Sequence, residues 1–466
     1  MSEGWSKGKG SALTQAVVAK LQAMRFEDFP EALVASARRL VIDGIAVAVA
    51  GASLEEAPRI LAGHLKRHAR EGDVSALGLG FGLAPVPAAL LNATSMHVLD
   101  FEPMWRPATH ALSPVLSAVL ALAEDRALSG RDAMTALVRG IEVQGWLRQA
   151  GMSESRDLRF HPPGVVGPIG SAAASACLLG LDADQTANAL GMAASRAGAL
   201  FTNLGTMTKS THCGQAAANG LDCALLTEAG FTATHRVFDE DSQGYFAGFM
   251  PTADPSVLLQ IGTHWRILDP GYAVKIYPAK FSTHYGIAAA LELHPKIADP
   301  EAIETIRIVV ADVPSSNRPF PRSGLDGKFS VQYTVAAALL DGRVGLDTFT
   351  DLRLSRPDMQ RLLPRITVEM PADMPSAYAT GRYGEVTVTL AGGESLTARC
   401  SNPRGSWGGE AMTEAEHRAK VENCLATALD RPVITQIIDG AARFEHLGGA
   451  ALQQLLRLAS GRKIHD

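Results

Sequence analysis

The stretch from residue 97 to 114 holds a dense group of side chains that could carry chemistry: His-Val-Leu-Asp-Phe-Glu-Pro-Met-Trp-Arg-Pro-Ala-Thr-His-Ala-Leu-Ser-Pro. Its internal prolines lack a backbone donor and favour extended neighbours, so they exclude a continuous helix. We therefore expect a loop between two helices that carries Asp100, Arg106 and His110. Such a loop on a rigid scaffold is a frequent place for enzymatic chemistry. Helix capping by Asp100 and His110 is the structural alternative.

Two further segments place basic side chains at the start of predicted helices. His161 precedes Pro-Pro-Gly and a run of small residues that predicts a closely packed central helix. Lys209 lies at or near the start of another predicted helix, between Thr208 and His212. A helix N-terminus carries free N–H groups and partial positive charge, so a lysine there favours an anion site. For His161 a structural role is the alternative.

Basic residues also gather where the character of the chain changes from helical to mixed. Residues 274–284 contain Lys275, Lys280 and His284, and residues 317–322 read Asn-Arg-Pro-Phe-Pro-Arg. A solvated lysine pair and a plain surface loop are the respective alternatives. Together, the candidate segments hold more histidine and lysine than carboxylate. This balance indicates an anionic substrate and proton transfer without a metal.

Composition and motifs exclude several other classes. The 466 residues include 43 Lys and Arg against 48 Asp and Glu, a net charge of -5, so nothing indicates a nucleic-acid partner. No apolar run approaches the roughly 18 residues of a membrane span. No glycine-rich dinucleotide or nucleotide loop and no His-Glu-x-x-His motif occurs. The five cysteines are scattered without a Cys-x-x-Cys pair, which favours a reducing, cytoplasmic setting.

The periodicity predicts a mostly α chain with an α+β part. Apolar residues recur every three or four positions through most of residues 11–265 and again in 406–466, which predicts a large all-helical domain to which the C-terminal segment returns. Residues 266–405 contain alternating patterns at 305–310 and a hairpin pattern across 385–398, which predict a smaller α+β lid domain.

Taken together, these segments resemble the MmgE/PrpD family from about residue 12 to 458. The shared motifs are His97-x-x-Asp100, Trp105-x-Pro-Ala-Thr-His110, Arg139-Gly-Ile-Glu-Val-Gln144, Phe160-His161-Pro-Pro, Thr208-Lys209 with His212, Lys275-x-x-Pro278, Ser282-Thr-His284, Asn317-Arg-Pro-Phe-Pro321 and Phe329-Ser-x-Gln-Tyr333. Several look most similar to the cis-aconitate decarboxylase branch. The chain departs from the family pattern at Glu102 and Pro103, where relatives have two aspartates.

The resemblance implies a homodimeric, cofactor-independent lyase that acts on a small di- or tricarboxylate. The catalytic residues that it implies are Asp100, His110, His161, Lys209 and Lys275. We add Arg106, Thr208, His212, Lys280 and His284 as candidate substrate contacts.

In the expected mechanism, Lys209 and Lys275 hold carboxylates, His110 is the main proton donor or acceptor, His161 is the second, and Asp100 orients an imidazole. The leading reaction is decarboxylation of cis-aconitate to itaconate. The alternatives are a 2-methylcitrate dehydratase, an iminodisuccinate epimerase and a catalytically silent carboxylate-binding homologue.

Overall fold

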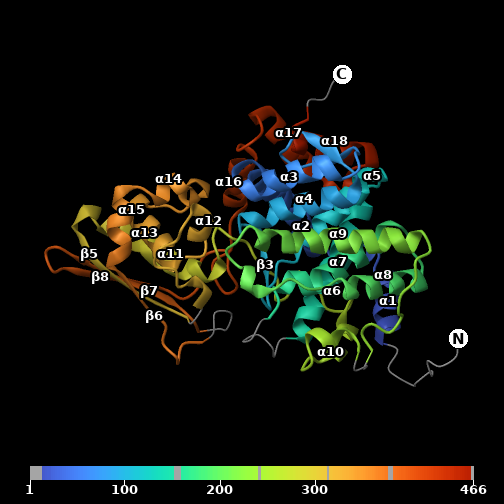
Figure 1. Cartoon of the computed structure of the whole chain (residues 1–466), viewed down its shortest axis with the longest axis horizontal. Helices are drawn as coiled ribbons and strands as arrows, with labels where there is room; N and C mark the ends of the chain where they lie inside the picture. The colour runs from blue at the N-terminus through green and yellow to red at the C-terminus, as the bar shows by residue number, and fades with distance from the viewer. Residues whose placement is uncertain (1–12, 152–158, 240–242, 312–313, 376–380, 463–466) are drawn as a thin grey trace.

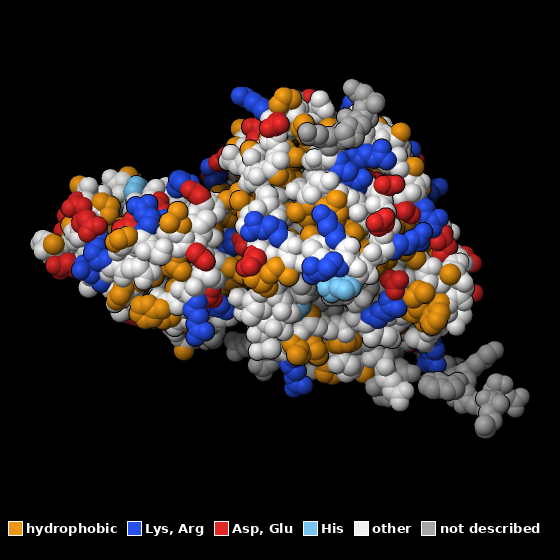
Figure 2. All heavy atoms as spheres, turned by 45° about the horizontal axis from the view of Figure 1, so that its top comes forward, with side chains coloured by type: hydrophobic (Ala, Val, Ile, Leu, Met, Phe, Trp, Pro, Cys, Tyr) orange, Lys and Arg blue, Asp and Glu red, His pale blue; other side chains and the backbone are white. Residues whose placement is uncertain are grey.

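The computed structural model describes residues 13–151, 159–239, 243–311, 314–375 and 381–462. A large helical domain lies beside a smaller α+β domain, and helix α16 lies between them in the view of Figure 1. This arrangement confirms the predicted fold class. In Figure 2, Lys and Arg side chains lie among Asp and Glu side chains over the visible face, without a large area of one sign. Among the described residues, no helix is long and apolar enough to cross a bilayer.

The helical domain is built from two separate parts of the chain. The C-terminal part returns to the first, with α16 packed on α2 and α18 packed on α5. The helices are α1 (Leu13–Ala23), α2 (Glu31–Leu54), α3 (Glu56–His68), α4 (Pro85–Val98), α5 (Leu112–Asp125), α6 (Gly130–Ala150), α7 (Pro162–Leu178), α8 (Ala183–Ser195), α9 (Thr208–Glu228), α10 (Tyr245–Phe249), α16 (Glu414–Leu425), α17 (Arg431–Ala441) and α18 (Gly449–Ser460).

Reciprocal side-chain caps begin three of these helices. At the start of α6, the Ser129 hydroxyl accepts the Asp132 N–H while the Asp132 carboxylate accepts the Ser129 N–H. Capping boxes of the same kind open α8 at Asp182 and α16 at Thr413. Each box satisfies two N–H groups that a helix start leaves without partners. In the sequence, each of these helix starts has a Ser, Asp or Thr followed three residues later by Asp, Gln or Glu.

Helix α7 is the central helix of this domain, and it packs against α5, α6, α8 and α9. Its small side chains permit the close approach that the sequence predicts. A Cβ atom on Gly220 of α9 would lie 2.4 Å from the Cβ atom of Ser171, and one on Gly140 of α6 would lie 2.6 Å from the Gly170 carbonyl oxygen. His161 directly precedes α7 and Lys209 lies in the first turn of α9, so two closely packed helices carry these side chains.

The α+β domain has one four-stranded sheet in the order β6-β5-β7-β8. Strand β5 is parallel to β6 and antiparallel to β7, which forms the predicted hairpin with β8. Helix α11 covers one face, onto which Val386 and Val388 point, while Arg307 pairs with Glu369 on the exposed face. The elements are α11 (His284–Leu293), β5 (Ile303–Val310), α12 (Gly324–Gly327), α13 (Val331–Asp341), α14 (Asp351–Leu354), α15 (Pro357–Leu362), β6 (Ile366–Glu369), β7 (Gly384–Leu390) and β8 (Ser395–Cys400).

Two short strand pairs were not expected from the sequence. Strand β1 (Val74–Ala76) pairs with β2 (Phe81–Leu83), and β3 (Met104–Trp105) pairs with β4 (Tyr272–Ala273). Strands of two or three residues are too short for an alternating pattern to reveal them. The β3–β4 pair ties the loop after α4 to the segment that leads into the α+β domain.

Each domain has its own hydrophobic core. The main core of the helical domain draws on residues from 13 to 267 and from 421 to 459, and the core of the α+β domain draws on residues from 279 to 398. The boundaries that the sequence predicts, at 265/266 and 405/406, lie close to the ends of these intervals. As exact boundaries they stay a prediction.

Candidate active site

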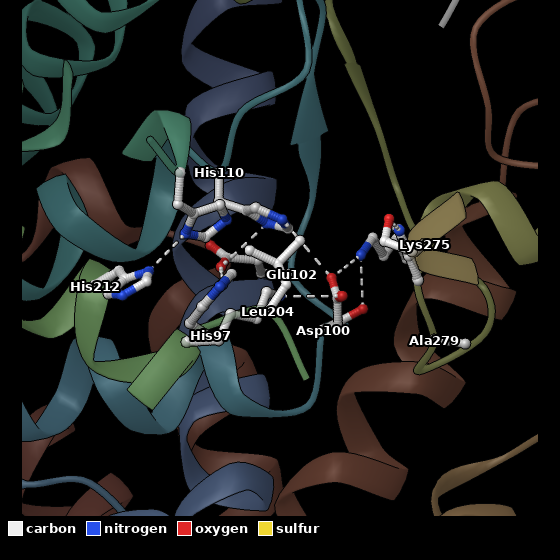
Figure 3. Close-up of polar contacts among 12 residues, drawn as sticks. His97, Asp100, Glu102, His110, Leu204, His212, Lys275 and Ala279 are labelled. Atoms are coloured by element: carbon white, nitrogen blue, oxygen red, sulfur yellow. Dashed lines mark hydrogen bonds and ion pairs between the residues drawn. The ribbon is translucent and has the colours of Figure 1, made fainter. Parts of the chain in front are cut away.

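Asp100 lies at the centre of the candidate site, in the loop that joins α4 to α5. Its backbone has a φ of 51°, which is uncommon for a residue with a side chain but tolerated by aspartate. Its carboxylate faces two ammonium groups. Lys209 Nζ lies 3.1 Å away, and Lys275 approaches from the other side, as Figure 3 shows. The Lys275 ammonium also donates to the Asp100 carbonyl oxygen at 2.8 Å. The α4–α5 loop, α9 and the segment before α11 therefore meet at one carboxylate.

Charge pairing at Asp100 outweighs the cost of its burial. Burial alone would raise the pKa of the Asp100 carboxyl, but Lys209 and Lys275 hold that pKa well below its ordinary value. Burial lowers the pKa of Lys275, and the charge of Asp100 opposes this shift. The carboxylate is thus ionised at neutral pH and shares its charge between two lysines.

Four imidazoles form a cluster beside this carboxylate. The ring centroids of His97 and His110 are 4.4 Å apart, those of His97 and His161 are 5.5 Å apart, and those of His161 and His212 are 5.3 Å apart. They come from the end of α4, the α4–α5 loop, the residue before α7 and the first turns of α9. The Nδ1 atoms of His161 and His212 lie 3.2 Å apart, within hydrogen-bonding distance.

Glu102 joins this cluster from the same loop as Asp100. Its Oε1 atom lies 2.6 Å from His97 Nδ1 and 3.4 Å from His110 Nδ1. The Ser113 hydroxyl also donates to Oε1, and the Ser113 N–H donates to Oε2, each at 2.9 Å. Burial would raise the pKa of Glu102, but its close contacts with the imidazoles of His110 and His97 lower it below its ordinary value. Glu102 is therefore a buried anion that holds two imidazoles.

The imidazoles are uncharged at neutral pH. Burial, followed by the charge of Lys209, lowers the pKa of His97 to about 3 and that of His212 to about 4. The same two causes place the pKa of His161 well below its ordinary value. Burial also lowers the pKa of His110, although Glu102 opposes the shift. A neutral imidazole has one N–H and one lone pair, so these rings can accept a proton.

The α+β domain contributes a further cationic group, the ammonium of Lys280. Lys280 is buried and donates to the Ser315 hydroxyl. Burial lowers the pKa of Lys280 to about 7, although Asp100 opposes the shift. The Phe329 ring lies between the two domains, with Lys209 Nζ 5.2 Å and the Arg318 guanidinium 5.3 Å from its centroid. Cations of both domains therefore converge on this region.

The remaining candidate contacts lie in other settings. His284 is buried, its Nε2 atom lies 3.3 Å from the Ala279 carbonyl oxygen, and burial lowers its pKa to about 3. Thr208 is the exposed first residue of α9. Arg106 is half-buried, and its carbonyl oxygen accepts from Arg266 Nη2 at 2.6 Å. No described hydrogen bond or ion pair joins Thr208 or Arg106 to the histidine cluster.

Within the described residues, the cluster also has the shape of a metal site. His97, His110 and His161 each offer a ring nitrogen, and these atoms lie within 4.8 Å of one another. Three imidazoles can ligate zinc. The ammonium groups that pair with Asp100 disfavour a cation here, because Lys209 already acts against protonation of these rings. Cys213, which with His97 and Glu102 forms a second such group, is held as the thiol because burial raises its pKa.

The structure thus brings together the five predicted catalytic side chains and His212. Sequence reasoning did not assign His97 or Glu102 to the site. In the sequence, the sign for both residues was that they lie within three positions of Asp100. His97 is in the last turn of α4, and Glu102 follows Asp100 by two residues.

Comparisons with known proteins point to one family. Residues 15–258 match the MmgE/PrpD N-terminal domain, and residues 277–442 match the MmgE/PrpD C-terminal domain. The chain is 31% identical over 470 residues to the cis-aconitate decarboxylase of Mus musculus, covering 98% of this chain and 95% of that protein. It is 36% identical over 339 residues to the cis-aconitate decarboxylase of Homo sapiens, covering 70% and 69%. It is 27% identical over 348 residues to the 2-methylcitrate dehydratase of Cupriavidus necator, covering 68% and 70%.

Proposed function

The chain belongs to the MmgE/PrpD family and is a lyase, and on this premise we propose that it decarboxylates cis-aconitate to itaconate and CO2 without a cofactor. The observation that carries this proposal is the group formed by Asp100, two lysines and four imidazoles, in a chain that is similar to a cis-aconitate decarboxylase along 98% of its length. Such a group of side chains can bind a polyanionic substrate and transfer a proton.

Substrate binding follows from the cations of both domains. A tricarboxylate attracts Lys209 and Lys275, whose charges a single Asp100 carboxylate does not balance. Lys280 adds a third ammonium group from the α+β domain at neutral and lower pH. Charge-assisted hydrogen bonds of this kind position carboxylates and stabilise developing negative charge.

The chemical step needs one proton. The bond between the methylene carbon and its carboxylate breaks and releases CO2, and its electron pair forms the new C=C bond of itaconate. The electron pair of the original double bond then takes up a proton at the far carbon. We assign this proton to His110, with His161 as the second proton-transfer group. The bound polyanion raises the pKa of these imidazoles, so a ring that is neutral in the free enzyme can carry the proton in the complex.

A dehydratase is the second candidate. The similarity to the 2-methylcitrate dehydratase of Cupriavidus necator favours it. Dehydration removes a proton α to a carboxylate, and a neutral imidazole is a suitable base for that task. The same residues would serve both reactions, so a substrate assay is needed to separate them.

The test is product analysis by NMR in D2O. The enzyme is incubated separately with cis-aconitate, 2-methylcitrate and iminodisuccinate, with heat-inactivated enzyme as the control. The proposal expects itaconate from cis-aconitate, with one deuterium at the carbon that takes up the proton. Turnover of 2-methylcitrate alone would replace the proposal by the dehydratase, and turnover of iminodisuccinate alone by an epimerase. Tight carboxylate binding without turnover would indicate a silent homologue.

Two further expectations belong to the same proposal. We propose that the protein is a homodimer, which the family resemblance supports and which light scattering on the purified protein tests. We also propose a cytoplasmic location. Its support is that Cys177, Cys213, Cys223, Cys400 and Cys424 are all free thiols, the state that a reducing compartment maintains.

A further inference from the structure

A buried charged cluster outside the catalytic side chains joins helix α16 to helix α2 of the helical core. Asp43 of α2 accepts Lys420 Nζ at 2.8 Å and His417 Nε2 at 3.1 Å, and both partners come from α16. All three residues are buried. Burial alone would raise the pKa of Asp43, but Lys420 and His417 lower it, so the carboxylate is ionised and pairs with the ammonium.

The same lysine also holds the loop that carries the catalytic carboxylates. Lys420 Nζ donates to the Phe101 carbonyl oxygen at 3.0 Å and lies 4.2 Å from the centroid of the Phe101 ring. Phe101 stands between Asp100 and Glu102 in the chain. One ammonium group therefore contacts the peptide between the carboxylate that pairs with two lysines and the carboxylate that holds two imidazoles.

Lysines from other elements hold the backbone of this loop: Lys275 donates to the Asp100 carbonyl oxygen and Lys420 to the Phe101 carbonyl oxygen. Asp100 has a φ of 51°, and a residue with a side chain in this region costs free energy that its surroundings must offset. A buried ammonium is itself costly unless its donors are satisfied, which here requires both the Asp43 carboxylate and the Phe101 carbonyl. Lys420 is thus poised to couple the position of α16 to the conformation of the loop.

We propose that Lys420, held by Asp43, is a positioning residue for the reaction: it fixes the peptide at Phe101 so that Asp100 and Glu102 face their partners. This inference rests on the proposed function for its kinetic readout, but not for its spectroscopic one. It assigns a role to the C-terminal segment of the helical domain, whose described residues 406–462 include none of the five side chains assigned to catalysis but hold the loop that carries Asp100.

The experiment compares three variants of the full-length protein. Lys420→Met removes the donor to Phe101 and leaves Asp43 buried without its main partner. Asp43→Asn/Lys420→Met removes both charges, so it relieves the unpaired charge but does not restore the donor. Arg418→Met is the matched control, because Arg418 lies on the same helix in an exposed pair with Glu422. The readouts are kcat, KM, Tm and the 15N chemical shifts of the histidine rings.

The expected result separates positioning from stability. Lys420→Met lowers both Tm and kcat, and the double variant recovers most of the lost Tm while its kcat stays at least about 10-fold below wild type. KM changes little, and the ring signals of His97 and His110 shift while that of His294, in the α+β domain, does not. Arg418→Met behaves as wild type.

A wild-type kcat in the double variant, or unchanged His97 and His110 signals in it, overturns the proposal. If the wild-type protein turns over none of the tested substrates, the proposed function fails, and the ring signals alone decide this inference.

Discussion

Nδ1 of His97 lies 2.6 Å from Oε1 of Glu102, and both side chains are fully buried. Because the Glu102 carboxylate is ionised and His97 is neutral, the imidazole must donate its one proton to Glu102. The lone pair of His97 then remains on Nε2, which has no hydrogen-bond partner among the described residues. A buried carboxylate that fixes a tautomer in this way determines which nitrogen atoms of the cluster can accept a proton.

Replacing Glu102 tests this relationship. Glu102→Gln keeps the shape of the side chain but removes its negative charge. That charge fixes the tautomer of His97, and the Oε1 atom that carries it lies 3.4 Å from His110 Nδ1. We expect kcat to fall by about 10- to 100-fold with a smaller change in KM, measured by steady-state assay.

The control for Glu102 is another buried carboxylate. Glu124 accepts the N–H and hydroxyl of Ser75, away from the candidate site. Glu124→Gln should change Tm without a comparable loss of kcat. Equal losses of kcat in both variants would show that burial of a carboxylate, and not its contact with the imidazoles, matters for the rate.

Lys280 should give the reaction an unusual pH dependence. Its pKa of about 7 means that the amine is charged below pH 7 and neutral above it. Because the substrate is an anion, kcat/KM should fall as pH rises through 7. In Lys280→Arg the side chain stays charged, so kcat/KM should change much less between pH 6 and pH 8. In Lys280→Met, kcat/KM should be low at every pH. Lys296→Met, at an exposed lysine, is the control. The same falling limb in Lys280→Arg would assign it to another group.

Buried histidines should make the protein sensitive to mild acid. The pKa of His284 is lowered to about 3, whereas an unfolded histidine titrates near 6.5. Between these values the unfolded chain binds more protons than the native chain, so the free energy of unfolding decreases as pH falls. At pH 5 the shifted pKa of this single histidine lowers the free energy of unfolding by up to about 2 kcal/mol.

His284→Gln isolates that contribution. Glutamine has no titratable ring, and its amide can still donate to the Ala279 carbonyl that lies 3.3 Å from His284 Nε2. Urea unfolding at pH 7 and pH 5 should show a smaller loss of stability in this variant than in wild type. In His68→Gln, which changes an exposed histidine, the free energy of unfolding should fall between pH 7 and pH 5 by as much as in wild type. An equal pH dependence in all three proteins would refute the assignment.

Chelation tests whether the three clustered imidazoles work without a metal. We expect activity to be unchanged after dialysis against EDTA, because the proposed reaction uses proton transfer and lysine-bound carboxylates. Added Zn2+ should not raise the activity, because the ammonium groups that pair with Asp100 disfavour a cation at the ring nitrogens of His97, His110 and His161. Loss of activity after EDTA treatment, restored by Zn2+, would mean that the cluster is a metal site.

Much of the fold follows from local sequence signals. The capping boxes at Ser129, Asp182 and Thr413 place helix starts because each satisfies backbone donors within one turn. The β7–β8 hairpin follows from alternation and its glycine turn. The β3–β4 pair did not follow, since its two-residue strands are joined only by tertiary structure.

The sequence predicted that Asp100, His110, His161, Lys209 and Lys275 lie together, as they do in the structure, but it predicted neither the presence of His97 and Glu102 beside them nor the pairing of these side chains. Motif resemblance indicated Asp100 and expected it to orient an imidazole. The structure pairs Asp100 with Lys209 and Lys275, and it also places the carboxylate 3.7 Å from His110 Nε2. Glu102 holds the imidazoles more closely. Which carboxylate meets which partner depends on the left-handed turn of the loop at Asp100, and no sequence pattern shows that turn.

The most direct test of the account is the rate at which His110→Gln decarboxylates cis-aconitate. His110 lies between Glu102 and Asp100, where a proton-carrying ring is required. The account predicts a rate at least about 100-fold below that of wild type, in a variant whose Tm and circular dichroism show that it is folded. A folded His110→Gln protein that forms itaconate at nearly the wild-type rate would contradict it.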